Sequence, residues 1–198
     1  MKMMFKKLFK AALVIGLSVF WICAAGAQTA SNGKGSTTHS AVTTAYTGNQ
    51  LFANNTSGNA VATPITINAV PPGQALTIRA LIYSTGTNKP GTSTLWLYSQ
   101  APTTTGLVDY SAYIGPYLSD LQANIYIGYL SCSAWQATND STAKYFSECS
   151  GSSQMLSTAL GQFTLGSAVT IYGLEEIGAY TPIASETHTY LLSTLHEN

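Results

Sequence analysis

A histidine and a glutamate near the end of the chain are the first candidates for chemistry. His188 follows Glu186 by two residues, and a histidine oriented by a carboxylate is the base that activates a serine in hydrolases. Residues two apart on a strand also share one face, so the same pair is typical of a solvent-exposed strand edge. The sequence contains no nucleophile elbow, no H-E-x-x-H zinc motif and no phosphate-binding glycine loop. We therefore identify no catalytic residue.

The other carboxylates offer two further kinds of site. Asp109 and Asp120 are candidates for the acid pair of a glycosidase or, with loop carbonyls, for a calcium site. Their spacing in the sequence does not give their separation in space, and no loop has the dense Asp and Asn spacing of a calcium loop. Asp109 is predicted to cap a turn. Glu175 and Glu176 follow a predicted strand and are expected to face water. No metal site and no cofactor site is predicted.

Two cysteines outside the N-terminal segment suggest a disulfide. Cys132 and Cys149 form an even pair, and an even pair in an exported chain is more often bridged than reactive. Between residues 40 and 187 there is no histidine and no third cysteine, so a zinc site is not favoured. We predict the disulfide Cys132–Cys149.

The N-terminal segment predicts export. Four lysines precede an uncharged, mostly apolar run at 11–25, and the small residues Ala25-Gly26-Ala27 follow it. This order is typical of a secretory signal peptide, here residues 1–27, cleaved near Ala27. The alternative is a retained membrane anchor, but the run is shorter than the ~20 residues of a spanning helix. Contact with a membrane is thus expected only through the signal segment before cleavage.

Two regions follow the signal. Residues 28–44 are rich in Ser, Thr, Gly and Asn and are predicted to form a flexible arm, in which His39 would be solvated. Residues 45–198 are predicted to form one domain. Without the signal, four basic residues remain against eight acidic ones, a net charge of −4, so the chain lacks the basic patch that nucleic acid requires.

Alternating apolar and polar residues predict β-strands and place the candidate residues on them. The stretch Ala75–Gln100 contains two alternating runs around a loop with Gly86, Asn88, Pro90 and Gly91, which predicts an antiparallel hairpin. A helical turn is expected only around 118–121. Short strands separated by turns predict an all-β fold, an antiparallel β-sandwich of jelly-roll type. The further predicted strands are 50–53, 64–69, 124–131, 132–135, 143–149, 162–165, 168–174 and 188–195.

Tyrosine is the residue type in surplus. The 12 tyrosines and three tryptophans would either fill the core or lie on a sheet face, where rings stack on sugars or pack against partner subunits. Filling the core is the interpretation we favour for any one ring, because sheets favour aromatic residues. A surface glycan is the alternative partner.

The chain contains the segments AYTGNQLF, PGQALTIRALIY, STLWLYSQAP, VDYSAY, LxxNIYIGYL and VTIYGLEEIGAYTPIASETHTYLLS. These segments resemble a set of uncharacterised β-sandwich proteins encoded among tailed-phage virion genes. The resemblance lies in strand and turn positions, not in a catalytic motif, and implies a structural or particle-surface protein without known active-site residues. The signal peptide departs from this set, because virion proteins are normally assembled in the cytoplasm. A bacterial exported relative, or a phage product routed through the envelope, reconciles the two.

These observations favour a non-enzymatic structural or surface protein of virion-like type, exported to the periplasm or outside the cell. If the chain is phage-encoded, the virion surface is the expected location. A secreted carbohydrate-binding module that uses surface tyrosines is the alternative, and a secreted hydrolase is a third interpretation. The first and last strands carry little charge, and open edges of that kind pair with other chains, so we expect a homo-oligomer or a larger assembly.

Overall fold

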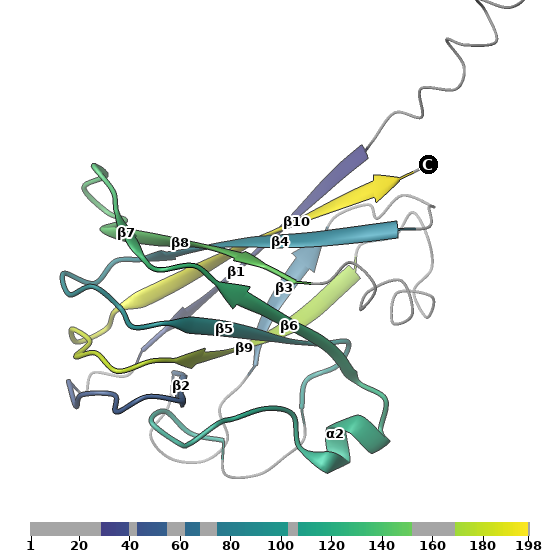
Figure 1. The fold of residues 1–198 in the computed structure, drawn as a ribbon, viewed down its shortest axis with the longest axis horizontal. Coiled ribbons are helices and arrows are strands. Elements are labelled where there is room, and N and C mark those ends of the chain that lie inside the picture. Colours follow the sequence, from purple (N-terminus) through teal and green to yellow (C-terminus); the bar gives the residue numbers. More distant parts are fainter. Residues whose placement is uncertain are drawn as a thin grey trace, which may run out of the picture.

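The structure is a computed structural model that describes residues 29–39, 43–54, 62–67, 75–102, 107–151 and 169–197. The predicted signal peptide, residues 1–27, and the predicted strand 162–165 lie outside these residues. The strands are β1 (Thr29–Thr38), β2 (Gln50–Phe52), β3 (Thr63–Ile67), β4 (Ala75–Ser84), β5 (Ser93–Tyr98), β6 (Tyr126–Cys132), β7 (Gln136–Ala137), β8 (Tyr145–Ser150), β9 (Val169–Ile177) and β10 (Thr187–Glu197). The helix α2 covers Leu118–Gln122 (Figure 1).

Eight of the described strands close into one antiparallel barrel. Their order is β9-β3-β1-β10-β4-β8-β6-β5, and β5 pairs with β9 to complete the circle. The predicted all-β antiparallel fold is therefore confirmed. The two-sheet jelly-roll sandwich is not confirmed, because the ladder from Ser93–Tyr98 to Tyr172–Ile177 joins the edges that would otherwise separate two sheets. Closure also leaves these eight strands without the open edges from which self-assembly was predicted.

The predicted flexible arm, 28–44, instead supplies a strand of the barrel. β1 pairs with β10 from Thr29↔His196 to Thr38↔Thr187, and with β3 at Gly33 and Lys34. At Gly35, β3 approaches the strand too closely for a side chain. A Cβ atom at Gly35 would lie 2.6 Å from the carbonyl oxygen of Pro64. One of the glycines that suggested a linker is thus required by close packing.

The predicted hairpin at Ala75–Gln100 does not form, although both of its strands do. β4 lies between β10 and β8, whereas β5 lies between β6 and β9. The connecting residues 85–92 are held by the segment before β10 instead of turning back. Asn88 donates a hydrogen bond to the carbonyl oxygen of Thr181, at 2.7 Å, and the amide of Gly178 donates to the carbonyl of Thr92, at 2.6 Å.

Two apolar clusters lie on opposite sides of the barrel wall. The first fills the interior with residues of seven strands and includes Trp135 and Cys149. The second lies outside β5 and β9, where Tyr98 and Leu174 are covered by β2 and by the chain from 107 to 113. Tyr98 follows Trp96 by two residues on the outer face of β5, and it is fully buried in this outer cluster. The wall is thickened on this side.

The predicted disulfide Cys132–Cys149 is present and joins β6 to β8. The two cysteines are register partners on neighbouring strands, and Cys149 faces the interior cluster. The bond closes a segment of 17 residues that contains Trp135 and β7. It fixes the position of Trp135 against the barrel interior.

Candidate functional site

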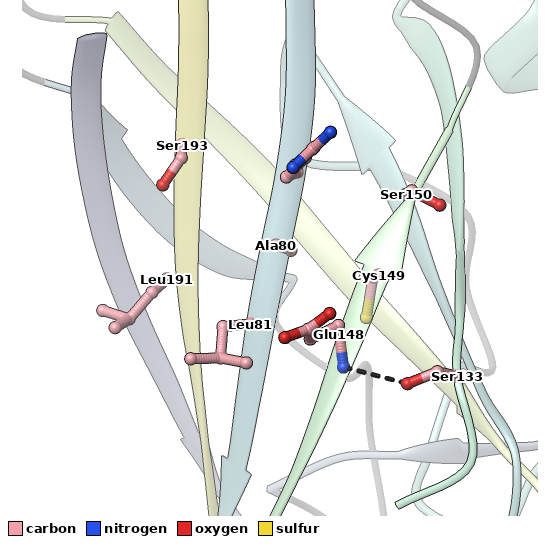
Figure 2. Close-up of a pocket in the computed structure, with 9 residues that line it drawn as sticks. Ala80, Leu81, Ser133, Glu148, Cys149, Ser150, Leu191 and Ser193 are labelled. Carbon is pink, nitrogen blue, oxygen red and sulfur yellow. Dashed lines mark hydrogen bonds between the residues drawn. The ribbon is translucent and has the colours of Figure 1, made fainter.

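A pocket of about 600 Å³ opens on the outer wall over β4, β8 and β10 (Figure 2). Its lining combines leucines, several serines and one charge of each sign. Glu148 of β8 is anchored through its backbone, whose amide donates to the Ser133 hydroxyl at 3.2 Å. The lining residues are Arg79, Ala80, Leu81, Ser133, Glu148, Cys149, Ser150, Leu191 and Ser193.

The histidine–glutamate pair predicted from the sequence lies inside the barrel, not on a solvent-exposed edge. His188 Nδ1 is 2.8 Å from Glu175 Oε2, and His188 Nε2 is 3.0 Å from Glu186 Oε1. All three side chains are fully enclosed. The expectation that Glu175 faces water is wrong, because β9 continues to Ile177 and turns Glu175 inward. We call His188, Glu175 and Glu186 the buried ionic cluster.

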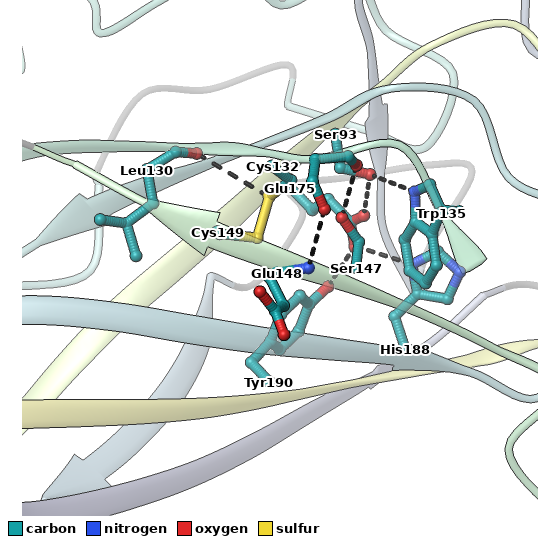
Figure 3. The surroundings of a disulfide bond; sticks show 11 residues. Ser93, Leu130, Cys132, Trp135, Ser147, Glu148, Cys149, Glu175, His188 and Tyr190 are labelled. Carbon is teal, nitrogen blue, oxygen red and sulfur yellow. Dashed lines mark hydrogen bonds and ion pairs between the residues drawn. A yellow bond between two sulfur atoms is a disulfide. The ribbon is translucent and has the colours of Figure 1, made fainter. Parts of the chain in front are cut away.

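Neighbouring side chains satisfy both carboxylates of the buried ionic cluster. On Glu175, Oε1 accepts from the Ser93 hydroxyl at 2.7 Å, and Oε2 accepts from the Tyr190 hydroxyl at 2.8 Å (Figure 3). Trp135 Nε1 in turn donates to the Ser93 hydroxyl at 3.2 Å. The same view shows the disulfide beside this network. The network therefore ties Trp135, which the disulfide loop carries, to β5, β9 and β10.

Glu186 is held at the end of the barrel by a second set of donors. The Ser84 hydroxyl donates to Oε1 at 2.5 Å, and the backbone amide of Ile183 donates to Oε2 at 3.1 Å. Gly86 packs directly on the carboxylate, since a Cβ atom at this position would overlap it. Each carboxylate oxygen of the buried ionic cluster thus accepts at least one hydrogen bond, as buried charges require.

The two carboxylates keep His188 protonated. Burial alone lowers the pKa of this imidazole, but the charges and hydrogen bonds of Glu175 and Glu186 outweigh it and raise the pKa to about 9. For the carboxyl of Glu186, burial acts in the opposite direction and raises the pKa. The hydrogen bond and charge of His188 outweigh burial there and lower the pKa below its ordinary value. Phe52 stacks on the imidazole, with ring centroids 3.8 Å apart at 9°, an arrangement that stabilises a cation.

This geometry favours a structural role over acid–base catalysis. A general base needs a free nitrogen within reach of a substrate, whereas both nitrogens of His188 bind carboxylates. The serines at hand, Ser84 and Ser93, donate their protons to the glutamates rather than to the histidine. Enclosure by Phe52 and Trp135 separates the imidazole from solvent. The hydrolase interpretation thus loses the pair on which it depended.

A second buried ion pair closes the same end of the molecule. His39 Nε2 is 2.8 Å from Asp109 Oδ2, and both side chains are fully enclosed. The Tyr46 hydroxyl donates to Asp109 Oδ1 at 2.6 Å, and the amide of Ala53 donates to the same oxygen at 3.1 Å. His39 is therefore not solvated, contrary to the prediction. The ring of Phe52 lies 5.5 Å from that of His39 and links the two ion pairs.

The two aspartates proposed as a glycosidase pair belong to different clusters. Asp109 binds His39 and Tyr46, whereas Asp120 lies buried in α2. Burial, the hydrogen bond to Tyr113 and, to a smaller extent, the charge of Asp120 raise the pKa of Tyr98 well above its ordinary value. Both carboxylates are at least 96% buried, since only 4% of Asp109 and 1% of Asp120 is exposed. Neither is open to a polysaccharide.

The most exposed apolar side chains gather beside α2. Ile114 is 82% exposed and Leu118 is 68% exposed, with Leu121, Tyr117 and Tyr129 exposed to lesser degrees. We call these five residues the apolar platform. In Figure 1, α2 lies at the lower right, below the strand β6 that carries Tyr129. Sequence reasoning missed the platform because an isolated apolar residue in a loop gives no signal of exposure.

Ring contacts hold the platform together. Trp96 lies 5.1 Å from Tyr129 and 5.9 Å from Tyr113, and Tyr113 lies 6.1 Å from Tyr117, as measured between ring centroids. Gly115 has a φ of +145°, a backbone conformation that favours glycine. The backbone of Gly115 packs against the ring of Trp96. Glu176 fixes the indole by accepting from Trp96 Nε1 at 2.9 Å.

Four tyrosines pack in the interior or in the wall, the arrangement that we favoured from the sequence for any one ring. Tyr46, Tyr98, Tyr113 and Tyr190 are each at most 2% exposed. Among the tyrosines, only Tyr117 and Tyr129 are among the exposed large apolar side chains of the described residues. The most exposed tyrosine rings of the described residues therefore belong to the platform.

The described ranges contain no group of three or more His, Cys, Asp or Glu side chains arranged to hold a metal ion. No helix within them is long and apolar enough to cross a membrane. No model of a known protein family matches the chain, and no curated protein matches it.

Proposed function

We propose that the protein is a non-enzymatic structural protein that assembles with further copies of itself through the apolar platform. The observation that carries this proposal is the exposure of Ile114, Leu118 and Leu121 beside two exposed tyrosines. Exposed large apolar side chains concentrated in one short segment, 114–121, are typical of interaction sites, because leaving them in water costs free energy that a partner recovers. The aromatic rings of the platform are of the type enriched at interfaces.

The arrangement of the polar groups supports a binding role instead of a catalytic one. The histidines His39 and His188 are engaged in buried ion pairs, and their carboxylate partners are enclosed with them. A closed barrel with the buried ionic cluster inside suits a building block. The residues left for interaction lie on the outside.

The location and ancestry are part of the same proposal. The disulfide fits an oxidising compartment, in line with export after cleavage near Ala27. The resemblance to tailed-phage virion proteins favours a particle-surface protein present in many copies. Neighbouring genes for capsid or tail proteins would support this origin, and neighbours that all encode cellular envelope enzymes would contradict it.

Sedimentation velocity of residues 28–198 over a range of concentrations tests the assembly. We expect a concentration-dependent oligomer, and we expect Leu118→Asp to reduce it to a monomer, because a buried unpaired charge is costly at an interface. Lys34→Asp, on the outer face of β1, is the matched control and should assemble normally. A wild-type monomer at about 100 µM, a concentration at which micromolar affinity would saturate, would rule out self-assembly.

A secreted carbohydrate-binding module remains the second proposal, favoured by the contact of Trp96 with Tyr129 at the edge of the platform. Sugar rings stack on such aromatic faces. Binding on a glycan array that Tyr129→Ala abolishes, in a protein that stays monomeric, would support it. Tyr83→Ala, a half-buried tyrosine on β4, is the control substitution.

A further inference from the structure

The outer pocket contains two opposite charges that the proposed assembly does not use. Arg79 on β4 pairs in register with Ser150 on β8, and the next outward pair is Leu81 with Glu148. Arg79 and Glu148 are therefore diagonal neighbours on one face, and such positions lie about 7–8 Å apart between Cα atoms. Side chains of this length reach one another across that distance.

The two charges nevertheless stay apart. Neither Arg79 nor Glu148 makes an ion pair within the part of the chain that the structure describes, and both side chains are exposed. Figure 2 shows the leucines Leu81 and Leu191 side by side on neighbouring strands. The pocket thus offers a positive and a negative group at its rim, with an apolar surface between β4 and β10.

We propose that this pocket binds a short zwitterionic peptide, of two or three residues, that carries an apolar side chain. The guanidinium of Arg79 binds the terminal carboxylate, since its planar fork matches a carboxylate. The carboxylate of Glu148 binds the terminal ammonium, and the apolar side chain packs on Leu81 and Leu191. Hydroxyl groups of Ser133 and Ser150 remain for the peptide bonds between the termini.

The size of the pocket agrees with this occupant. Its volume of about 600 Å³ lies in the range of small-molecule sites, which is about 300–1,000 Å³. An extended dipeptide or tripeptide spans about 7–11 Å, a length close to the spacing of about 7–8 Å between the Cα atoms of diagonal neighbours such as Arg79 and Glu148. A larger chain would leave one of its termini away from the charges, whereas a free anion would not use Glu148.

Titration of residues 28–198 with the dipeptide leucyl-leucine tests the proposal. Arg79 is the only arginine in the sequence, so its side-chain Nε–H gives one NMR resonance that reports directly on the site. We expect this resonance to shift with the free dipeptide up to about 10 mM, a range that covers weak binding. Absence of any shift would overturn the proposal.

Blocked peptides and matched variants assign the two contacts. The C-terminal amide and the N-acetyl derivative should each bind about five- to tenfold more weakly than the free dipeptide, and Arg79→Gln and Glu148→Gln should weaken the free dipeptide by the same factors. Isothermal titration calorimetry measures the variants. Arg79→Gln should not weaken binding of the C-terminal amide any further, because the amide has already lost the carboxylate that Arg79 binds. Glu148→Gln should likewise not weaken binding of the N-acetyl peptide any further. Lys89→Gln, in the exposed loop after β4, is the control.

Two results would refute the assignment even if binding occurs. Equal binding of the free and blocked peptides would show that Arg79 and Glu148 do not bind the charged termini of the peptide. Loss of binding on amidation but not on acetylation would show an anion site made by Arg79 alone. None of these measurements involves the apolar platform, so their failure and the failure of self-assembly are distinguishable.

Discussion

Replacing His188 by glutamine should remove most of the dependence of stability on pH between 6.5 and 9. In the folded protein, burial lowers the pKa of His188, but Glu175 and Glu186 outweigh burial and raise it from 6.5 to about 9. A histidine with a raised folded-state pKa stabilises the fold fully below its unfolded value of about 6.5. That contribution is lost as the pH rises through about 9.

The size of this contribution follows from the two pKa values. At 1.36 kcal/mol for each pH unit, the interval from 6.5 to about 9 corresponds to about 3 kcal/mol. The side chain is fully buried, so solvent does not screen the interaction. A loss of this size is also the order of magnitude expected when one partner of a buried ion pair is removed. It is a large part of the stability of an ordinary domain, about 5–15 kcal/mol.

Urea denaturation of residues 28–198, with the disulfide intact, measures the effect. We expect the free energy of unfolding of the wild type to fall by about 3 kcal/mol between pH 6 and pH 9.5. His188→Gln should be less stable at pH 6 and nearly independent of pH over the same interval. Both proteins should lose stability above pH 10, because burial raises the pKa of several tyrosines, Tyr46 and Tyr98 among them.

Two outcomes would refute this reasoning. A wild type with the same stability at pH 6 and pH 9.5 would mean that His188 is not held protonated by the glutamates. A His188→Gln variant with the slope of the wild type would mean that another group titrates in this interval. Glu186 does not confuse the test, because His188 lowers the pKa of its carboxyl and its contribution is lost only as the pH falls below the ordinary value of 4.5.

Three further predictions concern the barrel itself. Replacing Cys132 and Cys149 together by serine should lower the free energy of unfolding by about 3 kcal/mol, as expected for a loop of this length, and urea denaturation measures it; an unchanged midpoint would contradict the bond. Gly86→Ala should destabilise the protein by about 1–3 kcal/mol, because the added Cβ atom would overlap the Glu186 carboxylate. Thermal unfolding at pH 6 measures this effect, and a melting temperature equal to that of the wild type would contradict the close contact between Gly86 and Glu186. Deleting residues 28–38 should abolish folding, because β1 bridges β3 and β10; a truncated protein with a native far-ultraviolet circular dichroism spectrum would show that the arm is dispensable.

The strands that alternate clearly could be predicted from the sequence, whereas the pairing of one strand with the next could not. β4, β5, β6 and β10 were all predicted within a few residues of their observed ends, because one of their faces is apolar. β1 escaped notice because glycine replaces apolar side chains where β3 approaches it. The hairpin prediction failed because sequence adjacency does not determine strand order.

One of the two ion pairs in the buried ionic cluster could be predicted from the sequence. Glu186 and His188 are two residues apart, and their contact follows from that spacing along the chain. Glu175 lies on β9, and nothing in the sequence relates it to His188, since the barrel must close before the two side chains meet. Two adjacent glutamates usually face water, but here one faces the interior because a histidine compensates its charge.

Footprinting by hydroxyl radicals as the concentration of residues 28–198 is raised tests the central proposal most directly. Self-assembly through the apolar platform predicts that Tyr117, Leu118 and Tyr129 become protected as the oligomer forms. Tyr83, on the outer face of β4, should keep its reactivity and serves as the internal reference. An oligomer in which the platform residues react as fast as in the monomer would contradict the proposal.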